Sequence, residues 1–182
     1  PIEIEGRRIE PTCSGAPGSD SAFRFWARRG ASPNLVVFFD GGGACWDDVT
    51  CAIPRLAGHL REGDGLYKAE LLPGDNPNAM SGIFNLRNPR NPVRDWSFVF
   101  VPYCTGDVHS GSNTARYVDP DDGKTYTIEH RGADNFAAIL EWIRANFNAP
   151  ERMLVAGSSA GAYGAATHYA SSRKRFSAKT RP

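Results

Sequence analysis

Residues 153–164 read MLVAGSSAGAYG, an apolar run that enters a cluster of small residues. Met153–Ala156 has the length and composition of a buried strand, and Ala160–Ala170 is compatible with a helix. Between them lies a Gly-x-Ser-x-Gly motif centred on Ser159. In a nucleophile elbow, a strand turns sharply into a helix, and small neighbours accommodate the strained serine. The segment therefore predicts a nucleophilic Ser159, with an ordinary glycine-rich turn as the alternative.

Two further apolar runs, Leu35–Phe39 and Ser97–Val101, suit strands that are buried on both faces. From Gly132 to Phe147, apolar residues recur every three or four positions, which predicts a helix. Strands joined by helical crossovers pair in parallel, so the sequence predicts the α/β class with a mostly parallel sheet. The remaining expected elements are a strand over 22–28, a hairpin over 115–118 and 124–128, and an ordered loop excursion over 63–91.

The 182 residues are 41% hydrophobic and 23% charged, with a formal net charge of +1, as expected for a globular protein. We expect one domain over residues 1–170 and a frayed tail over 171–182, which carries five basic residues. The small net charge gives no support for nucleic-acid binding, and the apolar runs are too short to span a bilayer. We therefore expect neither nucleic acid nor membrane as a partner.

The four cysteines are Cys13, Cys45, Cys51 and Cys104. They allow three complete pairings, and spacing alone does not choose among them. Cys45 and Cys51 flank a predicted loop and suit a small disulfide ring, which would indicate an oxidising compartment; reduced buried thiols are the alternative. A zinc site is disfavoured because no CxxC spacing occurs. We expect no metal and no cofactor.

A triple glycine, Gly41–Gly43, follows the predicted strand Leu35–Phe39 after the single residue Asp40. Such a loop can aim backbone N–H groups into a cleft. Hydrolases with a nucleophile elbow take one oxyanion donor from the amide after the nucleophile and another from a glycine-rich loop. This pattern predicts an oxyanion hole formed by Gly42, Gly43 and Ala160. A phosphate-binding loop is disfavoured because no Gly-Lys-Ser/Thr follows.

Several uncommon motifs occur in order along the chain: DGGGACW at 40–46, NPRNP at 88–92, VPYCTGDVHSG at 101–111 and GSSAG at 157–161. On these motifs, over about residues 11–170, the chain resembles the family of pectin acetylesterases and Notum carboxylesterases, its bacterial members above all. The resemblance implies an α/β-hydrolase fold, Ser-Asp-His catalysis without metal, and removal of an acyl group from an oxygen ester. It also implies a secreted or periplasmic protein with disulfides Cys45–Cys51 and Cys13–Cys104.

The same resemblance assigns Ser159 as the nucleophile and Gly42, Gly43 and Ala160 as oxyanion residues. Relatives often carry tryptophan at the position of Gly43. The family's acid and histidine follow the elbow on later loops. The resemblance thus implies that they and the C-terminal strands lie beyond this chain, which we expect to be weakly active by itself.

Several other residues lie close in sequence to these motifs or carry groups that could act in a site. Trp46 and His109 are candidates for substrate contact, and Asp107 for organising the loop around His109. The chain order Ser, acid, His argues against His109 as the base. We expect structural roles for His59, His130 and His168. Asp119, Asp121 and Asp122 suit a turn better than a calcium site.

The sequence as a whole predicts a serine carboxylester hydrolase that removes acyl groups, acetyl above all, from a substrate such as acetylated pectin. The alternative is a non-catalytic glycan- or lipid-binding module on the same fold. A third interpretation is a half-enzyme that joins a complementary chain. The strand at Met153 would then form an exposed sheet edge, which predicts self-association.

Overall fold

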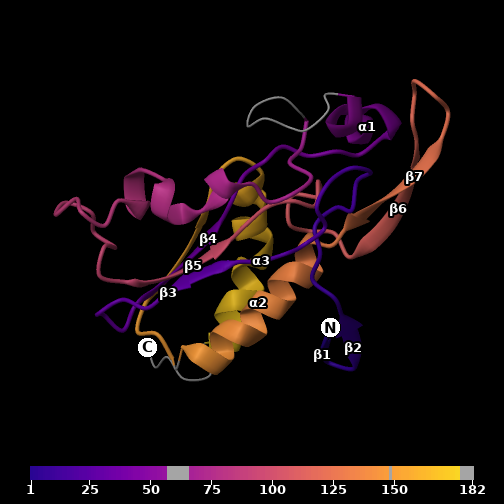
Figure 1. Cartoon of the computed structure of the whole chain (residues 1–182). Coiled ribbons are helices and arrows are strands. Elements are labelled where there is room, and N and C mark those ends of the chain that lie inside the picture. Colours follow the sequence, from indigo (N-terminus) through magenta and orange to yellow (C-terminus); the bar gives the residue numbers. More distant parts are fainter. Residues whose placement is uncertain (57–65, 148, 177–182) are drawn as a thin grey trace.

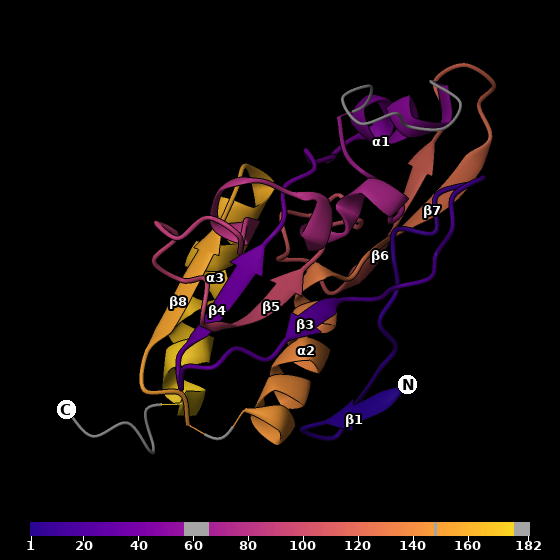
Figure 2. The ribbon, with the colours of Figure 1, turned by 60° about the vertical axis from the view of Figure 1, so that its left-hand side comes forward.

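The computed structural model describes residues 1–56, 66–147 and 149–176, with the backbone alone for 53–56 and 173–176. At its centre lies a four-stranded sheet in the order β3 (Trp26–Arg28), β5 (Ser97–Val101), β4 (Leu35–Phe39) and β8 (Met153–Gly157). Strand β4 pairs in parallel with β5 and with β8, whereas β3 pairs antiparallel with β5. Figure 2 shows the four strands side by side. The α/β class is confirmed.

The pairing register brings the ends of the three parallel strands to one edge of the sheet. Phe39 lies between Val101 on β5 and Gly157 on β8. The loops that follow these residues therefore leave from adjacent points, where open α/β sheets place their ligand sites. These loops are the glycine loop, defined here as Gly41–Gly43, the segment 102–111, and the turn at Ser158 and Ser159.

One face of the sheet packs against two helices, α2 (Gly132–Asn146) and α3 (Ala160–Phe176), which lie on the same side (Figure 1). Alternate residues of the strands point to this face because side chains alternate along a strand. The core here consists of Leu35, Val37, Phe39, Val99 and Val101 from the sheet and Phe136, Ile139, Leu140 and Ile143 from α2. The helix predicted from Gly132 is confirmed. Helix α3 extends six residues beyond Ala170, and the rest of the predicted tail, 177–182, lies outside the described residues.

The opposite face is covered by an excursion of the chain rather than by helices. Val36 and Phe98 pack there against Val93, with Phe84 and Trp96 at the margin. The described part of the excursion contains three short 3-10 helices, η1 (Pro73–Asp75), η2 (Pro77–Ala79) and η3 (Gly82–Phe84). Asparagine side chains accept hydrogen bonds from amides two residues later, which stabilises these turns: Asn76 from Asn78, Asn85 from Arg87, Asn88 from Arg90 and Asn91 from Val93. The described part of the predicted ordered excursion is therefore confirmed.

The remaining elements lie around the sheet. Strands β6 (Asn113–Val118) and β7 (Thr125–His130) form the predicted hairpin, and β1 (Ile2–Ile4) and β2 (Arg7–Ile9) form a second hairpin that was not predicted. In the β6–β7 turn, Asp119 Oδ1 accepts from the amide of Asp121, and Asp122 Oδ1 from that of Lys124. These contacts favour the turn interpretation of the aspartate cluster.

Two local predictions need correction. The strand expected over residues 22–28 is limited to β3, because only these three residues pair with β5; Phe23 and Phe25 instead pack against the helical core. Helix α1 (Asp48–Leu56) was not predicted. It begins where Asp47 Oδ1 accepts the amide of Thr50 at 2.7 Å, a local capping contact that stabilises a short helix.

Two disulfides join Cys13 to Cys104 and Cys45 to Cys51, which confirms the pairing that the resemblance implied. The first ties the N-terminal segment to the loop after β5, and the second ties α1 to Cys45, two residues after the glycine loop. The alternatives of reduced thiols and of a zinc site with thiolate ligands are wrong. His130 lies beside Cys45 and Cys51, but sulfurs bonded to each other offer no thiolate. Within the described ranges, no helix combines the length and apolarity needed to cross a membrane.

Candidate active site

Ser159 lies at the turn between β8 and α3 and is exposed to solvent. Its φ angle is +50°, a left-handed conformation that non-glycine residues rarely adopt. The turn is fixed on both sides: the amide of Ser158 donates to the carbonyl of Phe39 at 3.2 Å, and Gly161 donates to Ser158 at 2.7 Å. The backbone geometry expected of a nucleophile elbow is therefore present.

The glycines of the motif are explained by close backbone approaches. A Cβ atom at Gly161 would overlap the carbonyl oxygen of Phe39, and one at Gly157 would overlap the carbonyl of Gly161. These contacts let the start of α3 lie directly against the ends of β4 and β8. A side chain at either position would separate the helix from the sheet and move Ser159.

The glycine loop reaches the serine turn. A Cβ atom at Gly41 would lie 2.8 Å from the carbonyl oxygen of Ser158 and 3.0 Å from Cβ of Ser159. The two segments that the sequence assigned to one site are thus in contact, because β4 and β8 are neighbours in the sheet.

Main-chain hydrogen bonds hold the glycine loop from its other side. The amide of Lys68 donates to the carbonyl of Gly42 at 2.7 Å, and Ala44 donates to Leu66 at 2.6 Å. Gly43 has φ +75°, and a side chain there would overlap the carbonyl of Leu66, so this position requires glycine. Among the described residues, no acceptor takes the N–H of Gly42 or Gly43. Ala160 is the first residue of α3, where helix geometry leaves the N–H without an intrahelical acceptor.

His109 lies beneath this arrangement and is only 2% exposed. Its Nε2 is 2.8 Å from the carbonyl oxygen of Asp40, and because a carbonyl only accepts, Nε2 carries the proton. Burial lowers the pKa of His109 to about 4, against the opposing effects of the Asp40 carbonyl and Asp107. The ring packs against Gly164, which leaves room for it on α3. His109 is thus neutral and enclosed, which disfavours both substrate contact and a role as the base for Ser159.

Asp107 organises the loop around His109, as we expected from its position. Its Oδ1 accepts from the hydroxyl of Thr105 at 2.7 Å and from the amide of His109 at 3.1 Å. Its Oδ2 accepts from Gly111 at 3.0 Å and from Gly132, the first residue of α2, at 2.6 Å. One carboxylate therefore both closes the loop and caps a helix.

Two other histidines have structural contacts. His168 stacks on Phe39, with ring centroids 5.7 Å apart, and its Nε2 donates to the carbonyl of His109 at 2.7 Å. His130 donates from Nδ1 to the carbonyl of Thr105, and its Nε2 lies 2.8 Å from the hydroxyl of Tyr117. Trp46 is 68% exposed beside the glycine loop. His59 lies outside the described residues.

A charged group under the glycine loop was missed by the sequence analysis. Nζ of Lys68 lies 2.7 Å from Oδ2 of Asp40 and 2.7 Å from Oδ1 of Asp75. Burial raises the pKa of Asp40 despite the opposing effect of Lys68. No motif could have indicated this cluster, because Lys68 lies in the irregular excursion and meets Asp40 only through the fold.

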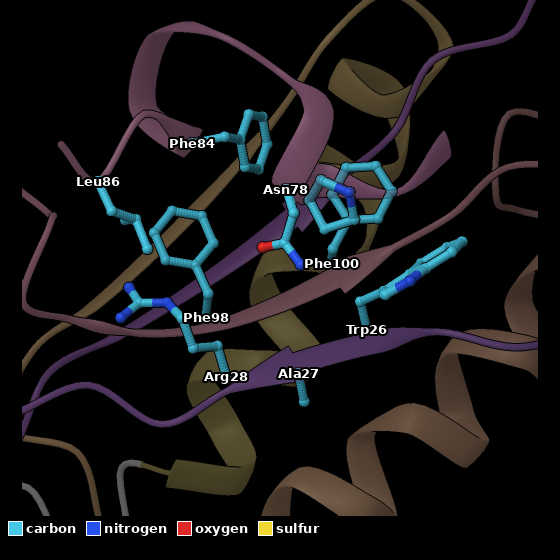
Figure 3. A pocket seen from close by; sticks show the side chains of 9 residues that line it. Trp26, Ala27, Arg28, Asn78, Phe84, Leu86, Phe98 and Phe100 are labelled. Atoms are coloured by element: carbon cyan, nitrogen blue, oxygen red, sulfur yellow. The ribbon is translucent and has the colours of Figure 1, made fainter. Parts of the chain in front are cut away.

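A pocket lies over β3 and β5, on the face of the sheet covered by the excursion (Figure 3). It has a volume of about 240 Å³. Trp26 and Arg28 from β3 and Phe98 and Phe100 from β5 form its floor, with Phe84 above them. The guanidinium of Arg28 donates to the carbonyls of Arg94 and Trp96, so it is already engaged. This pocket was not predicted from the sequence.

A family model described as pectinacetylesterase matches residues 11–181. The chain belongs to the pectinacetylesterase family. The resemblance found in the sequence is therefore confirmed, and the match includes both the glycine loop and the serine turn.

Two individual proteins are similar in sequence to this chain. Pectin acetylesterase 11 of Arabidopsis thaliana is 29% identical over 154 residues, covering 83% of this chain and 36% of the relative. Palmitoleoyl-protein carboxylesterase NOTUM of Schmidtea mediterranea is 24% identical over 136 residues, covering 73% of this chain and 23% of the relative. The chain thus spans about a third or less of the length of these proteins.

The structure of this chain matches two crystal forms of the Wnt deacylase Notum from Drosophila. Both have a TM-score of 0.55, with identities of 19% and 23%; the matches cover 92% and 90% of this chain and 45% and 44% of Notum. The likeness shows a shared fold of the α/β-hydrolase type.

Proposed function

We propose that this protein is a carboxylic ester hydrolase in which Ser159 is the nucleophile. The observation that carries the proposal is the left-handed φ of +50° at Ser159, in a turn that contacts the glycine loop. A strained, exposed serine beside backbone N–H groups that no described residue accepts is the arrangement used for acyl transfer in enzymes with a nucleophile elbow. Membership of the pectinacetylesterase family supports the same reaction class.

In the proposed reaction, Oγ of Ser159 attacks the ester carbonyl and its proton passes to a general base. The carbonyl oxygen of the tetrahedral intermediate accepts hydrogen bonds from the amides of Gly42, Gly43 and Ala160; one such donor contributes about 3 kcal/mol. The alcohol leaves with a proton, and water then hydrolyses the acyl-Ser159 ester. None of His109, His130 and His168 suits the role of base, because each has ring nitrogens engaged by other residues. With only these described histidines available, we expect slow turnover, because an unassisted serine hydroxyl is a weak nucleophile.

The proposed substrate is an acetylated polysaccharide such as pectin. The support is the family description and the name of the Arabidopsis relative. The planarian relative is instead named for a palmitoleoyl-protein ester. A series of p-nitrophenyl esters from acetate to long acyl chains separates the two: preference for acetate supports the pectin-type substrate, and preference for long chains contradicts it.

We further propose that the protein acts in a secreted or periplasmic setting. The two disulfides support this, because such bonds form and persist mainly in oxidising compartments. Measuring the free thiols of the protein isolated from its native source tests the proposal. No reactive thiol is expected, and four would contradict it.

Self-association through the sheet edge is also proposed. Strand β8 pairs only with β4 in the described sheet, and Leu154 on it is 38% exposed. An uncovered strand edge favours pairing with another chain. Light scattering should show a dimer or larger species that dissociates in Leu154→Lys; a monomer at all concentrations would contradict this.

The proposed activity is tested by acyl release from p-nitrophenyl acetate. Ser158→Ala is the matched control, because Ser158 is an exposed neighbour. We expect Ser159→Ala to abolish the enzyme-dependent rate and Ser158→Ala to retain most of it. Equal rates in both variants would contradict the proposal. If Ser159→Ala and the wild type bind acetylated pectin equally and neither releases acyl groups, the alternative of a binding module is favoured.

A further inference from the structure

The charged cluster of Asp40, Lys68 and Asp75 lies directly under the glycine loop. The side chains of Lys68, Asp40 and Asp75 are 16%, 14% and 12% exposed. The amide of Leu72 also donates to Oδ2 of Asp75 at 2.8 Å, so this carboxylate is anchored to the excursion. Ion pairs with so little exposure contribute weakly to stability because desolvation offsets their attraction. We therefore expect the cluster to act mainly by fixing the position of the neighbouring glycine loop.

Lys68 contacts the glycine loop in two ways. Its amide donates to the carbonyl of Gly42 at 2.7 Å, and its ammonium binds the carboxylate of Asp40, the residue just before the loop. The stem of Lys68 also fills the space beside Gly42, where its Cβ would lie 3.0 Å from an added Cβ atom. The loop is thus held at its start and at its middle by one residue.

Asp40 is held from its other side by histidines. His109 donates to the carbonyl of Asp40 at 2.8 Å, and His168 on α3 donates to the carbonyl of His109 at 2.7 Å. Helix α3 begins immediately after Ser159. A continuous set of contacts therefore joins the helix of the serine turn, through Asp40, to Lys68.

We propose that Lys68 is a positioning residue that fixes the glycine loop relative to Ser159, an inference that rests on the proposed function. It acts through Asp40 and the Gly42 carbonyl and touches no substrate. Displacing an acyl-transfer group by about 1 Å lowers the rate on the order of 100-fold. The ammonium of Lys68 should therefore affect the reactivity of Ser159 without any contact with the ester.

The test uses the full chain with Lys68→Met, which keeps the stem beside Gly42 and removes the ammonium. The amides of residue 68 and Ala44 donate the two main-chain hydrogen bonds between the glycine-loop segment and residues 66–68. Their hydrogen exchange therefore reports whether these two segments stay paired. We expect both amides to exchange at least about tenfold faster, while the β6–β7 hairpin amides keep their wild-type rates. Acetylation of Ser159 by p-nitrophenyl acetate should slow by about tenfold or more. Lys124→Met is the control, because Lys124 forms an exposed pair with Asp122 and should change neither reading.

A second pair of variants keeps the test decisive if Lys68→Met does not fold. Asp40→Asn and Asp75→Asn each leave Lys68 with one carboxylate, so both retain a balanced ion pair. We expect Asp40→Asn to accelerate exchange at Ala44 and residue 68 and Asp75→Asn to leave them close to the wild type. Equal effects of the two variants, or a uniform acceleration that includes the hairpin, would overturn the inference. If wild-type Ser159 is acetylated no faster than Ser158, the proposed function fails, and the exchange measurement still tests Lys68 independently.

Discussion

The two ends of the central sheet differ in how their local structure is maintained. After β4 and β8, the glycine loop and the serine turn are held by hydrogen bonds, an ion cluster and backbone contacts that only glycine allows. At β3 and β5, the pocket of Figure 3 is built from aromatic side chains that stack edge to face, such as Trp26 on Phe100. The first region contains buried charges and a left-handed serine, and the second is mostly aromatic. The first region is therefore maintained by directional polar contacts and the second by side-chain packing.

The largest expected effect tests the backbone contact in the strained region. Gly161→Ala should lower the free energy of unfolding by about 4 kcal/mol, because its Cβ would overlap the Phe39 carbonyl and neither backbone can move freely. Gly123→Ala is the control; no atom lies within 4 Å of its added Cβ, and its φ of +69° alone should cost about 1 kcal/mol. Urea denaturation measures both. Equal losses would show that the close approach at Gly161 is unimportant.

Asp107→Ala should have the next largest effect. It leaves the donors of Thr105, His109, Gly111 and Gly132 without their acceptor, at a cost of about 3 kcal/mol. The matched control is Asp122→Ala in the exposed β6–β7 turn, which should change stability by about 0.5 kcal/mol or less. Thermal unfolding compares the two variants, and a small effect at Asp107 would contradict its assigned role.

The pH dependence of stability tests the enclosed histidine. The pKa of His109 is lowered from 6.5 to about 4, so the unfolded chain binds a proton at a higher pH than the native protein does. Stability is therefore complete above pH about 7.5 and should fall by about 2 kcal/mol by pH 5. The lowered pKa of His168 acts in the same direction. His109→Asn should flatten this slope; an unchanged slope would show that His109 is not the group responsible.

The smallest effect is expected in the aromatic region. Phe84 is half-buried against Phe38 and Phe100, so Phe84→Ala should cost about 1.5 kcal/mol, less than a fully buried phenylalanine. It should leave acetylation of Ser159 unchanged, because Phe84 packs on the face of the sheet opposite α3, the helix that begins after Ser159. Loss of Ser159 reactivity in this variant would contradict the separation of the two regions.

The sequence predicted the strained region better than the apolar one, for physical reasons. A turn such as that of Ser159 needs small residues at fixed offsets, and the strands and helix around it have strong periodic patterns. The contacts of Lys68 with Asp40 and Asp75 were not predicted, because Lys68 lies in an irregular segment without sequence periodicity. The bounds of β3 and the existence of helix α1 were not predicted for a related reason. A few pairing or capping contacts determine where these elements begin and end, and the residues beside them have a similar sequence pattern.

The central claim is that the fold makes Ser159, and not serine in general, reactive toward esters. Site-resolved mass spectrometry of the wild-type chain after incubation with p-nitrophenyl acetate tests it most directly. Ser158 serves as the internal control, since it is exposed and adjacent but outside the strained position. We predict that acetyl-Ser159 accumulates at least about tenfold faster than acetyl-Ser158, as the contribution of oxyanion donors implies. Equal acetylation of the two serines, or none at Ser159, would contradict the account.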